Sequence, residues 1–142
     1  MKKLICTLAV LALCGVAALA QDVIGKWKLE DGSAIVEVYK NGDNYNGKIV
    51  WLAEPNDAEG NPLKDLANPD PKLRGRQVLG LNMLEGLVKE GDKYVKGNIY
   101  DPGSGKTYFC NMKVNGDVLK VTGSLDKKGL IGRKMDWYRV KE

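Results

Sequence analysis

The sequence contains no histidine, so its candidate reactive groups are carboxylates, cysteine and a glycine-rich turn. Without histidine there is no serine–histidine or cysteine–histidine nucleophile pair. Histidine-based zinc, copper and iron sites are excluded for the same reason. Glu37, Glu54 and Asp101 could supply an acid and a base for glycan cleavage, but no spacing in the sequence pairs them. We therefore predict no catalytic residue.

The glycine-rich turn Gly103 to Thr107 resembles the end of a phosphate-binding loop. The complete motif requires another glycine five positions before Gly105, where this chain has Tyr100. The turn also leads into a strand-like segment, whereas a phosphate-binding loop leads into a helix. We expect a hairpin turn here.

Neither sulfur nor oxygen ligands indicate a metal or cofactor. Cys110 is the only cysteine after residue 20, and its alternating strand-like surroundings favour a buried apolar role. Asp57, Glu59 and Asn61 stand at alternate positions that could contact calcium. Their loop lacks the glycine and the terminal glutamate of an EF-hand, so a solvated turn is favoured. We predict no cofactor and no metal.

Residues 1–20 have the features of a secretory signal peptide. Lys2 and Lys3 precede an uncharged apolar run that ends in the small-x-small site Ala18-Leu19-Ala20. A lipidation box at Cys14 is disfavoured because bulky Leu13 precedes it. We predict cleavage after Ala20, a periplasmic or secreted protein with no membrane span, and one domain over residues 21–142.

The charge balance gives no indication of nucleic-acid binding. The net charge is +4, and removing the two lysines of the signal leaves about +2 (4 − 2). Among the charged residues, basic ones predominate in 120–142 and acidic ones in 53–70. A solvated surface explains this unevenness, although an anion-binding tail is the alternative.

After residue 20, Asn-Gly and Asp-Gly turns separate short runs rich in valine, isoleucine, tyrosine and tryptophan. Such turns join antiparallel strands, and sequential hairpins can close into an eight-stranded, up-and-down β-barrel. Within these strands, Ile49 should share a face with Trp51, and Val95 with Ile99. The expected strands are Gly25–Glu30, Ser33–Lys40, Tyr45–Leu52, Arg76–Val88, Tyr94–Tyr100, Lys106–Val114, Val118–Gly123 and Ile131–Val140.

One predicted strand and one predicted loop depart from this simple pattern. Leucines in Arg76–Val88 could also line a helix, but three glycines favour a bent strand. Ala53–Gly75 holds four of the five prolines and is too long for a hairpin. We expect a long loop there, with Asp70 capping a short helical turn at Pro71.

Gly25-Lys26-Trp27 resembles the G-x-W motif of lipocalins and related calycins. In that pattern the tryptophan of the first strand packs beneath a basic side chain from the last strand. A guanidinium over an indole ring would close the barrel by a cation–π contact. Arg133 and Arg139 are the two candidates for this role.

Across residues 25–137 the chain resembles a bacterial family of small exported proteins known as domain-of-unknown-function family 2147. The resemblance implies export and a lipocalin-like barrel, and it carries no activity or catalytic residues. Leu125 to Gly129 is more charged than the corresponding apolar stretch of the family, which implies a more basic rim. The matching segments are Gly25-Lys26-Trp27, Glu30-Asp31-Gly32, Gly47 to Leu52, Asn68 to Pro71, Leu73-Arg74, Leu79 to Leu81, Gly97 to Thr107, and Gly132-Arg133 before Trp137.

The favoured function is binding of a small, partly apolar molecule inside the barrel, with Arg133 as a polar anchor. One alternative is an interaction module for an envelope protein, in which the 53–75 loop presents Asp70, Arg74 and Arg76. A more distant alternative is the carboxylate-dependent glycan hydrolase. The other residues predicted to line the pocket are Trp51, Tyr100, Tyr108, Met112, Met135 and Trp137.

Overall fold

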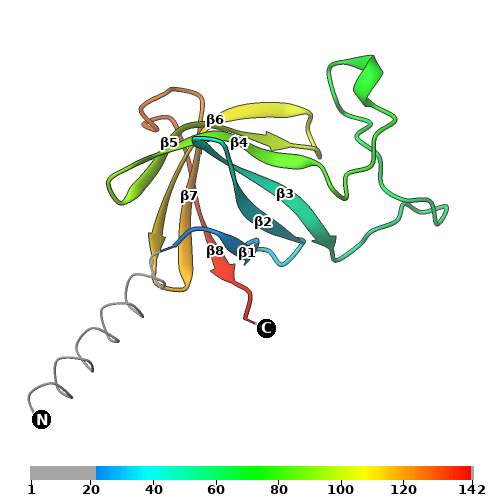
Figure 1. Cartoon of the computed structure of the whole chain (residues 1–142). Coiled ribbons are helices and arrows are strands. Elements are labelled where there is room, and N and C mark those ends of the chain that lie inside the picture. Colours follow the sequence, from blue (N-terminus) through cyan, green and yellow to red (C-terminus); the bar gives the residue numbers. More distant parts are fainter. Residues whose placement is uncertain (1–21, 142) are drawn as a thin grey trace, which may run out of the picture.

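Eight strands pair in sequence order and close into one antiparallel barrel (Figure 1). The computed structural model describes residues 22–141, so the predicted signal peptide and its cleavage site lie outside the described residues. The all-β, up-and-down barrel expected from the turn spacing is confirmed. The elements are β1 (Gly25–Lys28), β2 (Ala34–Asn41), β3 (Asn44–Leu52), the 3-10 helix η1 (Pro71–Leu73), β4 (Asn82–Glu90), β5 (Lys93–Asp101), β6 (Lys106–Asn115), β7 (Val118–Ser124) and β8 (Gly132–Arg139).

The barrel closes where β1 pairs with β8, through Trp27 opposite Arg139 and Lys28 opposite Tyr138. Closure satisfies the backbone groups that an open sheet would leave at its edges. Within residues 22–141 no helix has the length and apolar character needed to cross a bilayer.

The predicted strand Arg76–Val88 is correct only in its second part, because β4 begins at Asn82. The preceding residues pair within the β3–β4 connection, where Val78 N donates to Leu63 O and Asp65 N donates to Arg76 O. The strand is bent as expected. Gly86 has a φ of 76°, and its N–H donates to the Asn46 side chain at 2.9 Å.

The two ends of the barrel differ because hairpin connections alternate between them. One end, here called the closed end, carries the tight β2–β3, β4–β5 and β6–β7 turns and the segment before β1. The other end, called the open end, carries four connections. These are residues 29–33, 53–81, 102–105 and 125–131.

The half of the barrel near the closed end is filled by side chains. Trp27, Val36, Leu87 and Leu119 are completely buried in one continuous apolar core. Packing there is so tight that a Cβ at Gly97 would collide with the Leu87 side chain. Any space for a ligand must therefore lie toward the open end.

Candidate functional site: a cavity at the open end of the barrel

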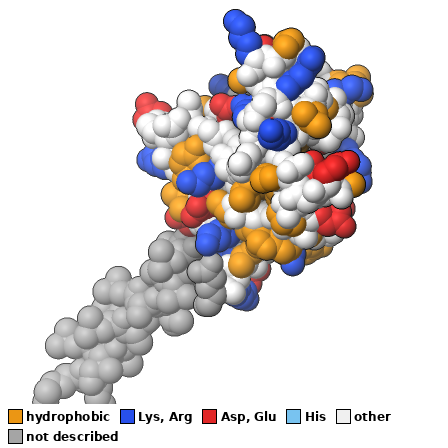
Figure 2. Space-filling view, turned by 90° about the vertical axis from the view of Figure 1, so that its right-hand side faces the viewer, with side chains coloured by type: hydrophobic (Ala, Val, Ile, Leu, Met, Phe, Trp, Pro, Cys, Tyr) orange, Lys and Arg blue, Asp and Glu red, His pale blue; other side chains and the backbone are white. Residues whose placement is uncertain are grey.

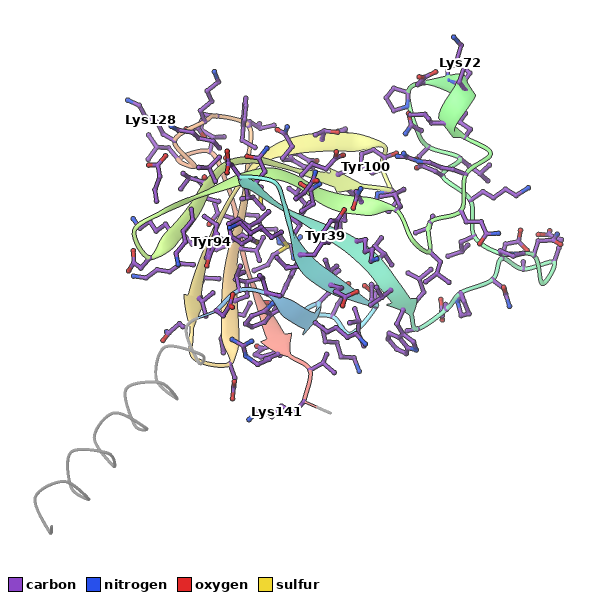
Figure 3. All side chains as sticks on the ribbon, in the orientation of Figure 1. Tyr39, Lys72, Tyr94, Tyr100, Lys128 and Lys141 are labelled. Carbon is purple, nitrogen blue, oxygen red and sulfur yellow. The ribbon has the colours of Figure 1, made fainter. Side chains whose placement is uncertain are left out.

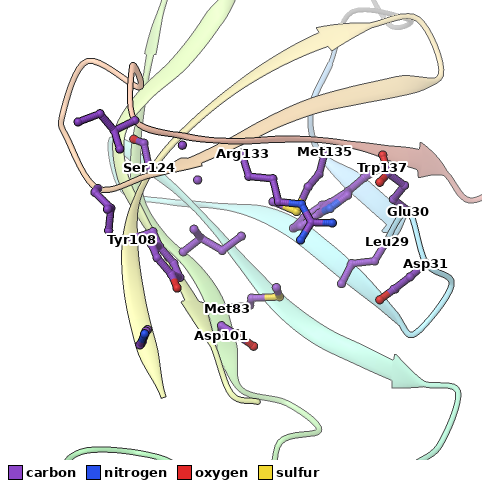
Figure 4. A pocket seen from close by; sticks show the side chains of 16 residues that line it. Leu29, Glu30, Asp31, Met83, Asp101, Tyr108, Ser124, Arg133, Met135 and Trp137 are labelled. Atoms are coloured by element: carbon purple, nitrogen blue, oxygen red, sulfur yellow. The ribbon is translucent and has the colours of Figure 1, made fainter. Parts of the chain in front are cut away.

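A cavity of about 680 Å³ lies at the open end of the barrel (Figure 4). Its volume falls within the range of about 300–1,000 Å³ that is typical of small-molecule sites. Every strand from β4 to β8 contributes to its wall, together with the β1–β2 and β7–β8 connections. The lining residues are Leu29, Glu30, Asp31, Met83, Ile99, Asp101, Lys106, Tyr108, Gly123, Ser124, Leu125, Ile131, Gly132, Arg133, Met135 and Trp137.

Apolar side chains form the deeper wall of the cavity. Met135 and Trp137 are two residues apart on β8, so strand alternation turns both inward. In Figure 4 they lie across the cavity from Met83 of β4 and Tyr108 of β6. Trp137 is 1% exposed and forms part of both the cavity wall and the core. This wall suits an apolar group.

Carboxylates at the cavity mouth already accept hydrogen bonds from the protein. Glu30 Oε1 accepts from Asp136 N at 2.9 Å, and Asp31 Oδ1 accepts from Ser33 N at 2.9 Å. Asp101 likewise accepts from the turn that follows it. Hydrogen bonds from Ser33 and, less strongly, the charge of Arg133 hold the pKa of Asp31 below its ordinary value. These acids are structural parts of the rim.

The two cationic side chains that line the cavity, Arg133 and Lys106, differ from these carboxylates. Within the described part of the chain, the side chains of Arg133 and Lys106 form no hydrogen bond or salt bridge. The Arg133 side chain extends from β8 into the cavity beside the apolar wall (Figure 4). The site thus combines an apolar surface with a guanidinium whose five donors form no hydrogen bond within residues 22–141.

Four of the seven residues predicted to line a pocket do so: Tyr108, Arg133, Met135 and Trp137. The other three lie elsewhere. Met112 points inward but is 2% exposed and packed in the filled half of the barrel. Tyr100 and Trp51 lie outside the barrel, so their predicted place in the pocket wall is wrong.

The misplacement of Trp51 has a clear cause in strand register. Ile35 pairs with Trp51 and Val36 pairs with Ile49, which leaves Val50 as an extra residue in a bulge. The extra residue rotates Trp51 to the outside, where Lys28 Nζ lies 5.2 Å from its ring centroid. The expected shared face of Ile49 and Trp51 is therefore wrong.

A second bulge, at Lys96 with a φ of 64°, shifts the register between Val95 and Ile99. The expected shared face of these two residues is therefore also wrong. Ile99 still faces the interior and lines the cavity. Tyr100 follows Ile99 directly in β5, so alternation alone places it on the outside.

The closed end contains the predicted contact between a tryptophan and an arginine. The guanidinium carbon of Arg139 lies 4.3 Å from the centroid of the Trp27 ring. Trp27 Nε1 donates to Val23 O at 2.8 Å, and Arg139 Nη2 donates to Asp22 O at 3.0 Å. Of the two candidates, Arg139 occupies this position, whereas Arg133 lies at the cavity.

Comparison with known proteins agrees with this architecture. The family described as "Uncharacterized protein conserved in bacteria (DUF2147)" matches residues 25–139. The chain belongs to this family. The resemblance predicted from its motifs is thus confirmed.

Among solved structures, the chain is similar to HP1028 from Helicobacter pylori, which is described as a member of the lipocalin family. The two share 27% identity with a TM-score of 0.76, over 85% of this chain and 84% of HP1028. No curated protein matches the chain.

Residues 53–81 of this DUF2147 barrel connect β3 to β4 and include the predicted helical turn, which is confirmed. Asp70 precedes η1, and its Oδ1 accepts from Lys72 N at 3.0 Å. Arg74 Nε donates to Asn68 O at 2.7 Å. Asp70 and Arg74 are therefore engaged in shaping the segment, which extends well away from the barrel in Figure 3.

The residue that fastens this segment to the barrel is Asp65, which the sequence reasoning missed. Its carboxylate is fully buried and accepts from Tyr100 Oη at 2.6 Å, Asn68 Nδ2 at 2.8 Å and Arg76 Nε at 2.9 Å. Burial raises the pKa of Asp65, but these hydrogen bonds and the charge of Arg76 outweigh it, so the pKa lies below its ordinary value. Arg76, predicted to face a partner, pairs with Asp65 while its side chain remains 41% exposed.

The remaining candidate groups do not form a reactive site. Glu37 alternates with buried Val36 and Val38 and so lies on the outer face of β2. Glu54 is exposed on the β3–β4 connection, and only Asp101 of the three proposed carboxylates lines the cavity.

Cys110 is buried, and this burial raises the pKa of its thiol to about 12. The expected hairpin after Asp101 is confirmed by its pairing with Lys106.

Proposed function

We propose that this protein binds a small amphipathic molecule whose apolar part fills the cavity and whose anionic head group contacts Arg133. One observation carries the proposal: a cavity of about 680 Å³ places an apolar wall beside an arginine whose side chain forms no hydrogen bond or salt bridge in the described part of the chain. The lipocalin assignment of HP1028, a structure similar to this chain, supports small-molecule binding.

The chemistry of the two parts is complementary. Removing an alkyl chain from water contributes about 0.8 kcal/mol for each buried methylene group. An arginine can hold a carboxylate or phosphate through two parallel hydrogen bonds, which a neutral head group would not match. The rim carboxylates Asp31 and Asp101 would repel an anion placed beside them, so the head group is directed toward Arg133 and Lys106.

A matched pair of ligands tests this proposal. Dodecanoic acid and dodecanol have equal chains, and Trp137 in the cavity wall provides a fluorescence signal. We expect the acid to bind about tenfold or more tightly than the alcohol, since a hydrogen bond to a charged group contributes about 1.5–3 kcal/mol. Arg133→Met should remove this preference while the alcohol still binds.

Lys134→Met is the matched control, because it removes a neighbouring charge that does not line the cavity. It should leave the preference for the acid intact. Failure of both ligands to change the fluorescence, or an equal effect of the two substitutions, would refute the proposal.

Export is part of the proposed function and rests on the sequence of residues 1–20. In that reading the protein acts in the periplasm or outside the cell. Expression in a bacterial host followed by fractionation and intact-mass measurement provides the test. We expect a soluble product of the periplasm or medium that begins at Gln21, and a cytoplasmic product that retains Met1 would contradict it.

The alternative of an interaction module has less support. The segment at residues 53–81 is well anchored, and Leu66 on it is 71% exposed. However, the face that carries this segment shows basic, acidic and apolar side chains intermixed (Figure 2). Such a face does not select one class of partner, whereas the cavity has a defined chemistry.

A further inference from the structure

The β7–β8 loop, residues 125–131, carries a concentration of exposed apolar side chains at the open end. Leu125 is 69% exposed, Leu130 80% and Ile131 63%. Leu130 is the most exposed large apolar side chain in residues 22–141. Single exposed leucines are common, but three within seven residues form a patch that needs an explanation. We call these three residues the apolar tip.

The apolar tip is held in place by hydrogen bonds within the loop. Asp126 Oδ1 accepts from Ile131 N at 2.7 Å, and its Oδ2 accepts from Leu130 N at 3.1 Å. Leu125 N donates to Ile131 O at 2.8 Å, and Ser124 Oγ donates to Asp126 O at 2.6 Å. The loop thus holds these three exposed side chains in a defined arrangement, in which Leu125 and Ile131 also border the cavity and Leu130 does not.

Positively charged residues lie next to the apolar tip in the sequence. Lys127 and Lys128 belong to the same loop, and Arg133 and Lys134 follow at the start of β8. The carboxylate of Asp126, the single acidic residue of the loop, accepts hydrogen bonds from backbone N–H groups of the same loop. The β7–β8 loop therefore combines exposed apolar side chains with Lys127 and Lys128, for which residues 22–141 provide no salt-bridge partner.

We propose that the β7–β8 loop docks the protein on the surface of an anionic lipid bilayer. Apolar side chains that enter the headgroup region and lysines that contact anionic lipids are the two components of interfacial binding. Lysine stems can lie along the apolar layer while the ammonium groups remain at the headgroups. The loop supplies both components on one short, protruding segment.

A second copy of this chain fits the same surface less well. A symmetric contact through the apolar tip would bring Lys127 and Lys128 of both copies together, and the acidic residue of the loop, Asp126, already accepts hydrogen bonds from its own loop. A stable interface also buries about 800 Å² on each partner, which three side chains on a loop do not provide. Charge complementarity favours the lipid surface.

Docking in this manner gives the cavity a defined orientation. Leu125 and Ile131 belong both to the apolar tip and to the cavity lining, so the cavity mouth would face the bilayer. Lys128 and Lys72 mark opposite sides of the molecule in Figure 3, so the segment at residues 53–81 would point elsewhere. The docking itself does not depend on the cavity being occupied.

Vesicle flotation tests the docking with Leu130→Asp, which changes a residue outside the cavity lining. Each variant is purified in the form that the host cell produces. Intact-mass measurement then verifies that all variants have the same N-terminus. The vesicles are phosphatidylcholine alone or with about 30 mol% phosphatidylglycerol, which gives the bilayer a negative surface potential. We expect at least fivefold more bound protein on the anionic vesicles, and at least a fivefold loss with Leu130→Asp.

Two control variants define the specificity of this result. Leu66→Asp changes a leucine of the β3–β4 connection that is 71% exposed, compared with 80% for Leu130, and should leave flotation unchanged. Lys127→Glu with Lys128→Glu should abolish the preference for anionic vesicles, whereas Lys40→Glu with Lys89→Glu, near the closed end, should retain most of it. Unchanged circular dichroism and thermal midpoint confirm that each variant folds.

The proposal is wrong if flotation is equal on neutral and anionic vesicles, or if Leu66→Asp and Leu130→Asp act alike. It is also wrong if sedimentation velocity shows a dimer that Leu130→Asp dissociates, with no protein bound to vesicles. Binding of dodecanoic acid by Leu130→Asp should remain as in the unmodified protein, so failure of docking and failure of cavity binding are separate results.

Discussion

The hydroxyl of Tyr100 donates a 2.6 Å hydrogen bond to the fully buried carboxylate of Asp65, which lies 35 residues earlier in the chain. This contact joins the β3–β4 connection to the outside of β5. A second close approach supports it, because a Cβ at Gly105 would collide with the carbonyl oxygen of Ala67. The long segment is therefore attached to the barrel wall at residues that belong to the β5–β6 hairpin.

Replacing Tyr100 by Phe should loosen this segment without opening the barrel. The change removes one of three side-chain donors to a buried carboxylate, which costs about 1–3 kcal/mol. We expect faster hydrogen exchange and faster tryptic cleavage within residues 53–81, with core amides unaffected. Tyr138→Phe, on an exposed tyrosine of β8, is the control. Equal protection in the two variants would contradict the role of this bond.

Arg139→Met should destabilise the whole barrel, because Arg139 joins both of its closing strands. The substitution keeps an apolar stem over Trp27 but removes the cation–π contact and the hydrogen bonds to Asp22 O and Gly116 O. We expect a loss of about 2 kcal/mol in the free energy of unfolding by urea. Arg133→Met should cost less than about 0.5 kcal/mol. The reverse order would show that Arg133 closes the barrel.

Gly123→Val should fill part of the cavity while the fold is retained. A Cβ at Gly123 would lie 3.4 Å from Ile99 Cγ2 and 3.9 Å from Tyr108 Cβ, which is ordinary contact between cavity-lining residues. Valine also suits a β-strand. We expect at least tenfold weaker binding of dodecanoic acid with an unchanged thermal midpoint. Thr122→Val, on the other face of β7, should bind normally, and undiminished binding by Gly123→Val would place the ligand elsewhere.

Stability should fall at alkaline pH because of Cys110. Burial raises the pKa of its thiol to about 12, whereas an unfolded cysteine titrates near about 8.5. The neutral thiol therefore stabilises the fold fully below about pH 8.5, and this contribution disappears as the pH rises toward about 12. Tyr100 acts with the same sign above about pH 10, since burial and Asp65 raise its pKa to about 12.

Urea unfolding at a series of pH values between 8 and 11 measures this effect. Each such group can contribute a slope of up to about 1.4 kcal/mol per pH unit. Cys110→Ala should be less stable at pH 8 because it leaves a small void, yet its stability should fall less steeply up to pH 10. Parallel curves for the two proteins would rule out titration of the thiol as the cause.

The features that were predictable from the sequence are those that depend on neighbouring residues. Asn-Gly and Asp-Gly pairs favour tight turns through local backbone preferences, so the number and order of the strands could be expected. The contact between Trp27 and a basic residue of the last strand was predictable from its motif, but the choice between Arg133 and Arg139 was not. Only the pairing of β1 with β8 places Arg139 opposite Trp27.

The cavity wall was only partly predictable, because one extra residue in a strand reverses the orientation of every side chain beyond it. Bulges at Val50 and Lys96 arise from pairing with neighbouring strands, and the local pattern of apolar residues does not reveal them. For this reason Tyr108, Met135 and Trp137 could be placed at the interior from alternation, whereas Trp51 could not.

The sequence by itself determined an eight-stranded barrel and the identity of its closing motif, because period-two alternation and turn chemistry act over a few residues. The tertiary structure decided that half of the interior is filled, that Arg133 lines a cavity at the open end, and that Asp65 is buried and hydrogen-bonded to a tyrosine distant in the sequence. Burial and pairing depend on residues that are far apart in the chain, and only the closed barrel brings them together.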